Sequence, residues 1–159
     1  NECGNRAASE IITFSTEAFS CKTYASNEFP KDIRSNKTTS FTINIPDDTN
    51  VADVNIKSII GDHDNFYDLD GTLIGPDSTI VNLFSAKCFQ NGALVFNFGM
   101  DDESNQKFKC PPYQGTYYPS GKLSDLKGKN AKGDWVLEIF DRQSPKGGEL
   151  SGFEFTMGK

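Results

Sequence analysis

Apolar and polar residues alternate along several stretches of the chain, and this period of two predicts β-strands with one buried face. The segment SFTINIP places Phe41, Ile43 and Ile45 on one side. The stretch TLIGPDSTIVNLF predicts two strands joined by a turn over Gly75–Ser78, because Gly, Pro, Asp and Ser favour turns. The same alternation is found at Val54 and Ile56, at Leu94, Phe96 and Phe98, at Trp135, Leu137 and Ile139, and at Phe153, Phe155 and Met157.

These strands predict the fold class. A helical period is nearly absent, whereas about seven or eight short strands can be traced. The chain is therefore expected to be all-β and to form an antiparallel β-sandwich. A weaker edge strand is expected at 10–16, and long loops are expected at Gly61–Asp68, Met100–Lys109 and Pro111–Asn130.

Length and charge narrow the classes of function. The 159 residues fit one domain, in which residues 1–39 form an N-terminal segment that is partly within the sandwich and residues 40–159 form its core. The formal net charge is −6 and the pI is about 4.8, which argues against nucleic acid and against a basic membrane-surface patch. No apolar run approaches the length of a membrane span. An acidic surface suits divalent cations and solubility alike, so the charge does not choose between them.

The cysteines are Cys3, Cys21, Cys88 and Cys110, and none of them forms a CxxC pair, which argues against a zinc ribbon or a thioredoxin-like site. An even number of cysteines in a turn-rich acidic chain indicates disulfides and a secreted or extracellular (cell-surface) protein. Of the possible pairings we favour the two local ones, Cys3–Cys21 and Cys88–Cys110. In the chain-entropy model each bridge stabilises the fold by about 3 kcal/mol.

Few residues suit catalysis. The one histidine, His63, lies between Asp62 and Asp64 in a predicted loop, where it is expected to be solvated. No Gly-x-Ser-x-Gly motif accompanies it, so a serine hydrolase triad is not indicated. Glu138 and Glu154 occupy polar positions of alternating strands and are expected to face water rather than to form a glycosidase pair. We therefore expect no catalytic residues and no enzymatic activity in this chain.

Acidic residues beside predicted strands are candidates for a calcium site. Asp68 and Asp70 come before one strand, while Asp101, Asp102 and Glu103 follow another. Calcium takes about six to eight oxygen ligands, which two loops at the same end of a sandwich can supply. Solvated loops with Asp caps and turns are the alternative. The full set of candidate calcium ligands is Asp68, Asp70, Asp101, Asp102, Glu103 and Asp141, of which Asp141 has the closing of a turn as its alternative role.

The C-terminal part of the chain carries several motifs in a definite order. The segment GTYYPSGKLSDLKGKNAKGDWVLEIFDRQSPKGGELSGFEF contains a Gly-Thr-Tyr-x-Pro stretch, a Gly-x-Asn-Ala-x-Gly-x-Trp join, a strand ending in Asp and a Gly-rich turn before an aromatic strand. This order resembles the P domain, also called the Homo B domain, of proprotein convertases and bacterial subtilisin-like proteases. The residues that match the family pattern are Gly115, Tyr117, Pro119, Leu123, Ser124, Gly128, Asn130, Gly133, Trp135, Asp141, Gly148, Leu150 and Phe153.

The resemblance extends upstream and covers about Ser40 to Met157. NIPDD, DLDGTLIGPDSTIVNLF and FGMDDES are similar to the family's first strand end, its central strand pair and its acidic loop. CPPYQGTY, together with the local cysteine pair, resembles secreted bacterial versions of the domain. Two positions depart from the family pattern, because Gly61–Phe66 looks inserted and Phe153 stands where the family commonly has Trp.

The resemblance implies a jelly-roll-like sandwich that serves as a non-catalytic accessory module. Its partner would be a subtilisin-like catalytic domain, which it stabilises or targets, or another surface protein. The resemblance also supports bound calcium as a cofactor. Within the module the GKNAKGDW join is expected to be structural, because Gly128 and Gly133 permit positive φ and Trp135 anchors the next strand in the core.

A carbohydrate-binding or adhesion module is the alternative function, because jelly-roll sandwiches often bind sugars on one face. Tyr67, Tyr113, Tyr117 and Tyr118 are the rings available to stack on a glycan. Their alternative role is to pin the long Pro111–Asn130 loop by packing while their hydroxyl groups stay solvated. A glycan partner therefore stays open beside a protein partner.

Overall fold

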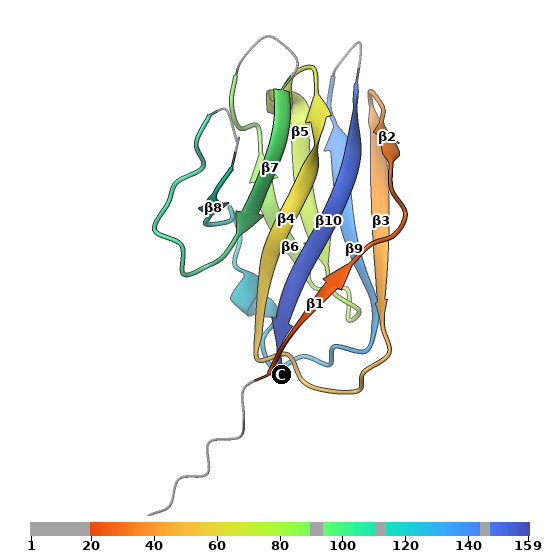
Figure 1. Ribbon diagram of the computed structural model, residues 1–159, viewed down its shortest axis with the longest axis vertical. Coiled ribbons are helices and arrows are strands. Elements are labelled where there is room, and N and C mark those ends of the chain that lie inside the picture. The colour runs from red at the N-terminus through yellow and green to blue at the C-terminus, as the bar shows by residue number, and fades with distance from the viewer. Residues whose placement is uncertain (1–19, 90–93, 111–113, 144–146) are drawn as a thin grey trace, which may run out of the picture.

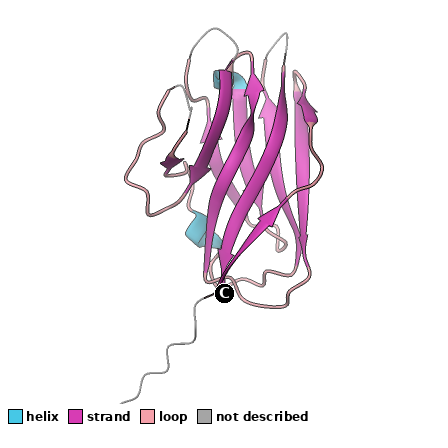
Figure 2. Ribbon diagram, in the orientation of Figure 1, coloured by secondary structure: helices cyan, strands magenta, loops and turns pink. Residues whose placement is uncertain are grey.

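The structure, a computed structural model, is a sandwich of two β-sheets packed face to face (Figure 1). Strands dominate it, and its helical elements are the short 3₁₀ helices η1 (Phe66–Asp68) and η2 (Leu123–Leu126) (Figure 2). The all-β sandwich expected from the sequence is confirmed. Among the described residues, no helix has the length and apolar character needed to cross a membrane. The structure describes residues 20–89, 94–110, 114–143 and 147–159.

The first sheet contains six strands. They are β1 (Cys21–Ala25), β2 (Lys31–Ile33), β4 (Asp53–His63), β7 (Leu94–Met100), β8 (Thr116–Tyr117) and β10 (Gly148–Gly158). Their order is β1-β10-β4-β7-β8, and β2 also pairs with β10. Because β1 and β2 both pair with β10, this part of the N-terminal segment belongs to the sandwich. The strand expected at 10–16 lies outside the described residues.

The second sheet contains four strands. They are β3 (Lys37–Ile45), β5 (Leu69–Ile74), β6 (Ile80–Ser85) and β9 (Gly133–Asp141), in the order β3-β9-β5-β6. All pairs in this sheet are antiparallel, whereas β7 and β8 of the first sheet pair in parallel. The chain crosses repeatedly between the sheets, for example from β3 to β4 and from β9 to β10, in a jelly-roll-like arrangement.

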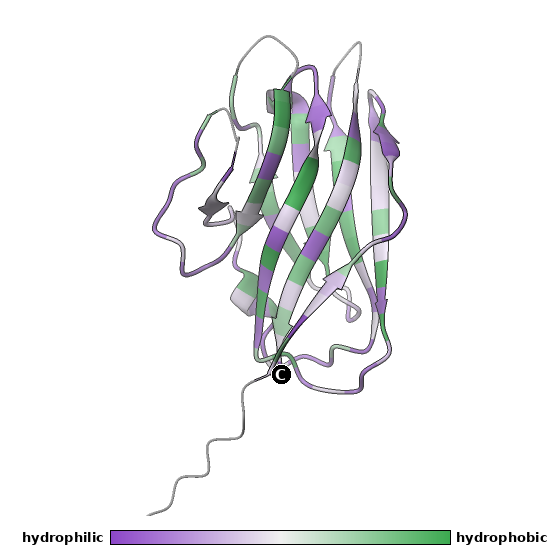
Figure 3. Cartoon of the chain, viewed as in Figure 1, coloured by the Kyte–Doolittle hydropathy of each residue, from purple (hydrophilic) through white to green (hydrophobic). Residues whose placement is uncertain are grey.

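Strand β9 shows how the alternating sequence pattern becomes a core. Its register against β3 places Trp135 opposite Ile43. Trp135, Leu137 and Ile139 are buried, while the residues between them are partly exposed. The same alternation of apolar and polar residues is visible along β4 and β10 (Figure 3). The inward residues of the two sheets therefore pack against each other as the period of two predicts.

The join that leads into β9 is structural, as expected. Trp135 is only 1% exposed, and its indole Nε1–H donates a hydrogen bond of 2.8 Å to the carbonyl oxygen of Ala131. The indole ring lies 5.3 Å from the ring of Phe155, measured between centroids. Gly128 and Gly133 adopt φ values of +78° and +127°, which an L side chain rarely takes. The Gly- and Lys-rich stretch is thus a turn that places the indole in the core.

A cluster of aromatic rings forms the other large part of the core. The rings come from η1, β6, β7, β8 and the loop after β7, and their centroids lie 5.0–6.3 Å apart. Contacts between rings add to the stabilisation from burial, so the cluster holds this loop against the first sheet. Its members are Phe66, Phe84, Phe96, Phe98, Phe108 and Tyr117.

The segment Gly61–Asp68 is not the long loop expected from the sequence. β4 continues through Gly61 to His63, because this stretch pairs with the start of β10. η1 follows and buries Phe66 completely. The expectation of a long loop is wrong because the strand period continues through the polar residues. Gly61 and His63 face inward and Asp62, between them, faces solvent.

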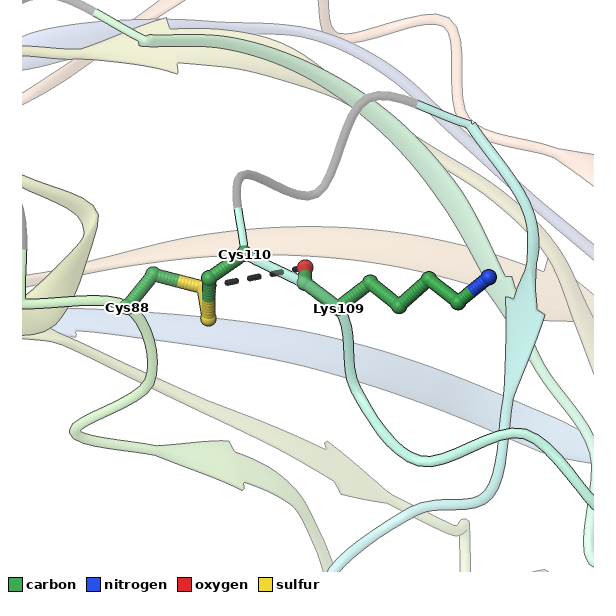
Figure 4. The surroundings of a disulfide bond; sticks show 3 residues. All are labelled: Cys88, Lys109 and Cys110. Atoms are coloured by element: carbon green, nitrogen blue, oxygen red, sulfur yellow. Dashed lines mark hydrogen bonds between the residues drawn. A yellow bond between two sulfur atoms is a disulfide. The ribbon is translucent and has the colours of Figure 1, made fainter.

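One of the two expected disulfides is present. The Cys88–Cys110 bond, with a sequence separation of 22, ties the segment after β6 to the loop before β8 (Figure 4). Cys88 Sγ lies 3.7 Å from the carbonyl oxygen of Lys109, a van der Waals contact because a disulfide sulfur carries no proton. Cys21 is exposed and bonded to no described cysteine. Cys3 lies outside the described residues, so the Cys3–Cys21 pairing stays a prediction.

Replacing Trp135 by alanine is expected to lower the free energy of unfolding by about 3–5 kcal/mol, because the lost ring leaves a cavity in the core. Phe140→Ala on the same strand is the matched control. Phe140 is 38% exposed, so its replacement should cost about 1 kcal/mol or less. Urea unfolding followed by circular dichroism measures both variants. Equal costs for the two would contradict the core position of Trp135.

Candidate functional site

The buried polar side chains of the described core are those of His63 and Asp141. His63 ends β4 in the first sheet and Asp141 ends β9 in the second, so the pair joins the two sheets at one end of the sandwich. His63 Nε2 lies 3.2 Å from Asp141 Oδ2, and both side chains are 0% exposed. A carboxylate beside an imidazole is the arrangement that orients a catalytic histidine, so access to the ring decides its role.

The surroundings of His63 leave it no access to a substrate. Its Nδ1 lies 2.9 Å from the carbonyl oxygen of Asn65 and 3.1 Å from the backbone nitrogen of the same residue. Nδ1 therefore has a partner whether or not it carries a proton, and Nε2 is occupied by Asp141. The pair acts as a link between the sheets. The expectation that His63 is a solvated loop residue is wrong, because its inward position on β4 buries it.

Asp68 and Asp70 lie near this end, where Arg142 contacts both. Arg142 Nη1 is 3.1 Å from Asp70 Oδ1, and the backbone N–H of Arg142 donates to the carbonyl oxygen of Asp68 at 2.8 Å. Asn65 Nδ2 donates to Asp68 Oδ2 at 2.9 Å. Asn65 Oδ1 and Asp70 Oδ1 are buried without a hydrogen bond, although the ion pair with Arg142 balances the charge of Asp70. The guanidinium of Arg142 thus neutralises Asp70, which a bound metal ion would otherwise do.

The acidic residues after β7 serve the backbone around them. The carboxylate oxygens of Asp102 accept the backbone N–H groups of Leu123 at 2.9 Å and Ser124 at 2.8 Å, where η2 begins. Asp101 Oδ1 accepts the backbone N–H of Glu103 at 2.7 Å. These contacts are the turn and capping roles that Asp side chains commonly take.

The six expected calcium ligands do not meet at one point. Strands β4 and β7 are antiparallel, with His63 opposite Leu94 at the start of β7, so the acidic residues that follow β7 lie toward the other end of the sheet. Among the described residues, no group of three or more His, Cys, Asp or Glu side chains could hold a metal ion. The residues therefore do not fit one six-ligand calcium centre. Calcium binding stays a prediction.

The four candidate tyrosines differ in their availability to a ligand. Tyr117 is 1% exposed and packs in the aromatic cluster, so it anchors the loop rather than stacking on a sugar. Tyr67 is 37% exposed, and the guanidinium of Arg142 lies 5.6 Å from its ring centroid. Tyr118 is 41% exposed. Tyr113 lies outside the described residues.

The surface has depressions that are open to solvent. One of about 510 Å³ lies between β2 and β3 and is lined by residues that include Lys31, Arg34 and Lys37. Two others, of about 410 and 530 Å³, border the loop after β7 and share Ser104. None of these three depressions contains His63 or Asp141. The buried pair is therefore separate from them.

No family model and no curated protein matches the chain. Among solved structures, a serine protease of Aeromonas sobria overlaps 92% of this chain and 28% of its own, with a TM-score of 0.59 and 15% identity. The complex of the Aeromonas sobria serine protease with the chaperone ORF2 overlaps 87% of this chain and 26% of the matched one, with a TM-score of 0.54 and 16% identity. This chain thus spans less than a third of the chains it matches. At these identities the likeness shows a shared β-sandwich fold.

Replacing Asp141 by alanine is expected to lower the free energy of unfolding by about 3 kcal/mol, because the buried imidazole of His63 loses its carboxylate partner. Asp141→Asn keeps an acceptor oxygen of the same size and should cost clearly less. Asp70→Ala breaks a partly exposed ion pair and should cost about 1 kcal/mol or less. Guanidinium denaturation measures all three variants. If Asp141→Ala costs no more than Asp70→Ala, the pair is not a link between the sheets.

Proposed function

We propose that this chain is a non-catalytic accessory module of a secreted or cell-surface protein, of the P-domain kind, that stabilises or targets a subtilisin-like catalytic domain. The observation that carries the proposal is the overlap with the Aeromonas sobria serine protease, in which a sandwich like this one fills 28% of the chain. The rest of that protease chain, outside the overlap, is long enough to contain its catalytic part. The P-domain motifs spread over Ser40 to Met157 agree with this reading.

The side chains of this protein support a role in binding a partner rather than in catalysis. A serine protease needs an imidazole that reaches both its nucleophile and the substrate, whereas the one histidine of this chain is fully buried. Glu138 and Glu154 occupy outward positions on β9 and β10, which belong to different sheets. They therefore lie on opposite faces of the sandwich and do not form the close carboxylate pair of a glycosidase.

The disulfide supports the proposed location. Bonds such as Cys88–Cys110 persist in oxidising compartments and are rare in the reducing cytosol of mesophilic organisms. A module that works outside the cell gains from this cross-link, because it restrains the unfolded chain. The proposed site of action is therefore extracellular, either released or at the cell surface.

Sequencing the gene around this coding segment, followed by co-expression with the subtilisin-like catalytic domain found there, tests the proposal. A one-to-one complex is expected in size-exclusion chromatography with light scattering, together with a higher Tm of the catalytic domain. The Trp135→Ala variant, whose core is disrupted, should fail to raise that Tm. A gene without such a catalytic domain, or two partners that elute separately, would contradict the proposal.

Calcium remains a separate proposal with its own test. Thermal unfolding is recorded with calcium and with EDTA for the wild-type protein and for the variants Asp70→Asn and Asp101→Asn, which represent the two acidic regions. Bound calcium should raise the Tm, and the variant at the binding region should lose that increase. An unchanged Tm, with no metal found by mass spectrometry of the native protein, would rule calcium out.

A further inference from the structure

Tyr118 presents a partly exposed aromatic ring. It is 41% exposed, and within the described residues its ring makes no aromatic or cation–π contact. The rings of two other tyrosines contact charged or aromatic side chains. Tyr24 is buried and has two lysine ammonium groups over its ring, while Tyr67 has the Arg142 guanidinium over its ring and forms a T-shaped pair with Phe89, with 5.1 Å between the ring centroids. Tyr118 is therefore the described tyrosine best placed to stack on a ligand.

Tyr118 borders a depression of about 410 Å³ whose walls are partly polar and partly apolar. The polar side chains in these walls are those of Asp102, Ser104, Lys122 and Ser124. An apolar ring face beside hydroxyl, carboxylate and ammonium groups matches a ligand that carries both a C–H face and many hydroxyl groups. A pyranose ring has this character.

The walls of the depression are held in place before any ligand arrives. Asp102 bonds to the backbone at the start of η2, and Ser104 Oγ donates to the carbonyl oxygen of Thr116 at 2.7 Å. The backbone N–H of Tyr118 donates to the carbonyl oxygen of Gln106 at 3.1 Å. These hydrogen bonds hold the loop after β7 against β8, Tyr118 and the start of η2. A preformed site loses less conformational entropy when a ligand binds.

A second depression adjoins the first one at Ser104. It measures about 530 Å³, shares Ser104 with the first, and is lined by residues that include Glu103, Asn105 and Gln106. Amide and carboxylate groups are suited to hydrogen bonds with sugar hydroxyl groups. The two depressions together offer room for more than one sugar unit. The carboxylates of Asp101, Asp102 and Glu103 outnumber the ammonium of Lys122, so an anionic ligand would be repelled.

We propose that the groove formed by these two depressions binds a neutral oligosaccharide, with Tyr118 as the ring that stacks on one pyranose unit. Asp102, Ser104 and Ser124 then accept or donate hydrogen bonds at the hydroxyl groups of that unit, and Asn105 and Gln106 contact the next one. This site does not depend on a protease partner. In a secreted module it would attach the protein to a polysaccharide surface.

The test is an NMR titration of the ¹⁵N-labelled chain with cellohexaose, xylohexaose, maltohexaose and chitohexaose, each at millimolar concentrations. At least one of them should cause saturable shifts of the amide signals of residues 101–106 and 116–124. Tyr118→Ala should weaken that binding by about tenfold or more, because the stacking ring is lost. Tyr118→Phe keeps the ring and should change the affinity by about threefold or less.

Tyr67→Ala is the matched control, because Tyr67 is exposed to a similar extent but has its ring covered. Its affinity for the sugar should equal that of the wild type, and an oligogalacturonate should bind more weakly than the neutral sugar. Each variant must keep the amide spectrum of the folded protein outside the groove. The proposal is overturned by a failure of all four neutral sugars to bind, by shifts that map elsewhere, or by equal affinities of Tyr118→Ala and the wild type.

Discussion

Contact between the inward faces of the two sheets is the interaction on which the rest of the structure depends. Trp135 of β9 and Phe155 of β10 meet across it, one from each sheet. Because successive side chains of a strand point to opposite faces, burial of these rings also determines the register of their strands. A slip of one residue would turn Trp135 toward solvent and Phe140 into the core.

The polar residues at the ends of the strands mostly satisfy groups of the protein itself. His63 and Asp141 bind each other, and Asp102 holds the start of η2. At the C-terminus, hydrogen bonds from the ammonium groups of Lys159 and Lys22 lower the pKa of Asp47 to about 2 and tie the last residue to the loop after β3. These acidic side chains thus have structural roles within the protein. Their number alone is therefore a poor guide to function.

The surface that these residues support carries the features on which the proposed functions rest. The described part of the chain buries its one histidine and places Glu138 and Glu154 on opposite faces, so these residues form neither an accessible serine-protease triad nor a close carboxylate pair. It does present a preformed groove around Tyr118 and a sandwich whose fold recurs as a minor part of a protease chain. Both features agree with the proposed module, which would work by binding a protein partner, a polysaccharide, or both.

Apart from β1, β2 and β8, the sequence by itself determined the strands, the Gly75–Ser78 turn, the buried Trp135 and the Cys88–Cys110 bond. Each of these depends on a local period, on local turn chemistry or on a short separation along the chain. The alternation also places His63 and Asp141 at inward positions, but it does not show that residues 78 apart in the chain form a pair. Nor does the alternation show that Tyr117 is buried while its neighbour Tyr118 is exposed. Only the tertiary structure decided these points, because they depend on how distant strands pair and stack, and no local pattern specifies that.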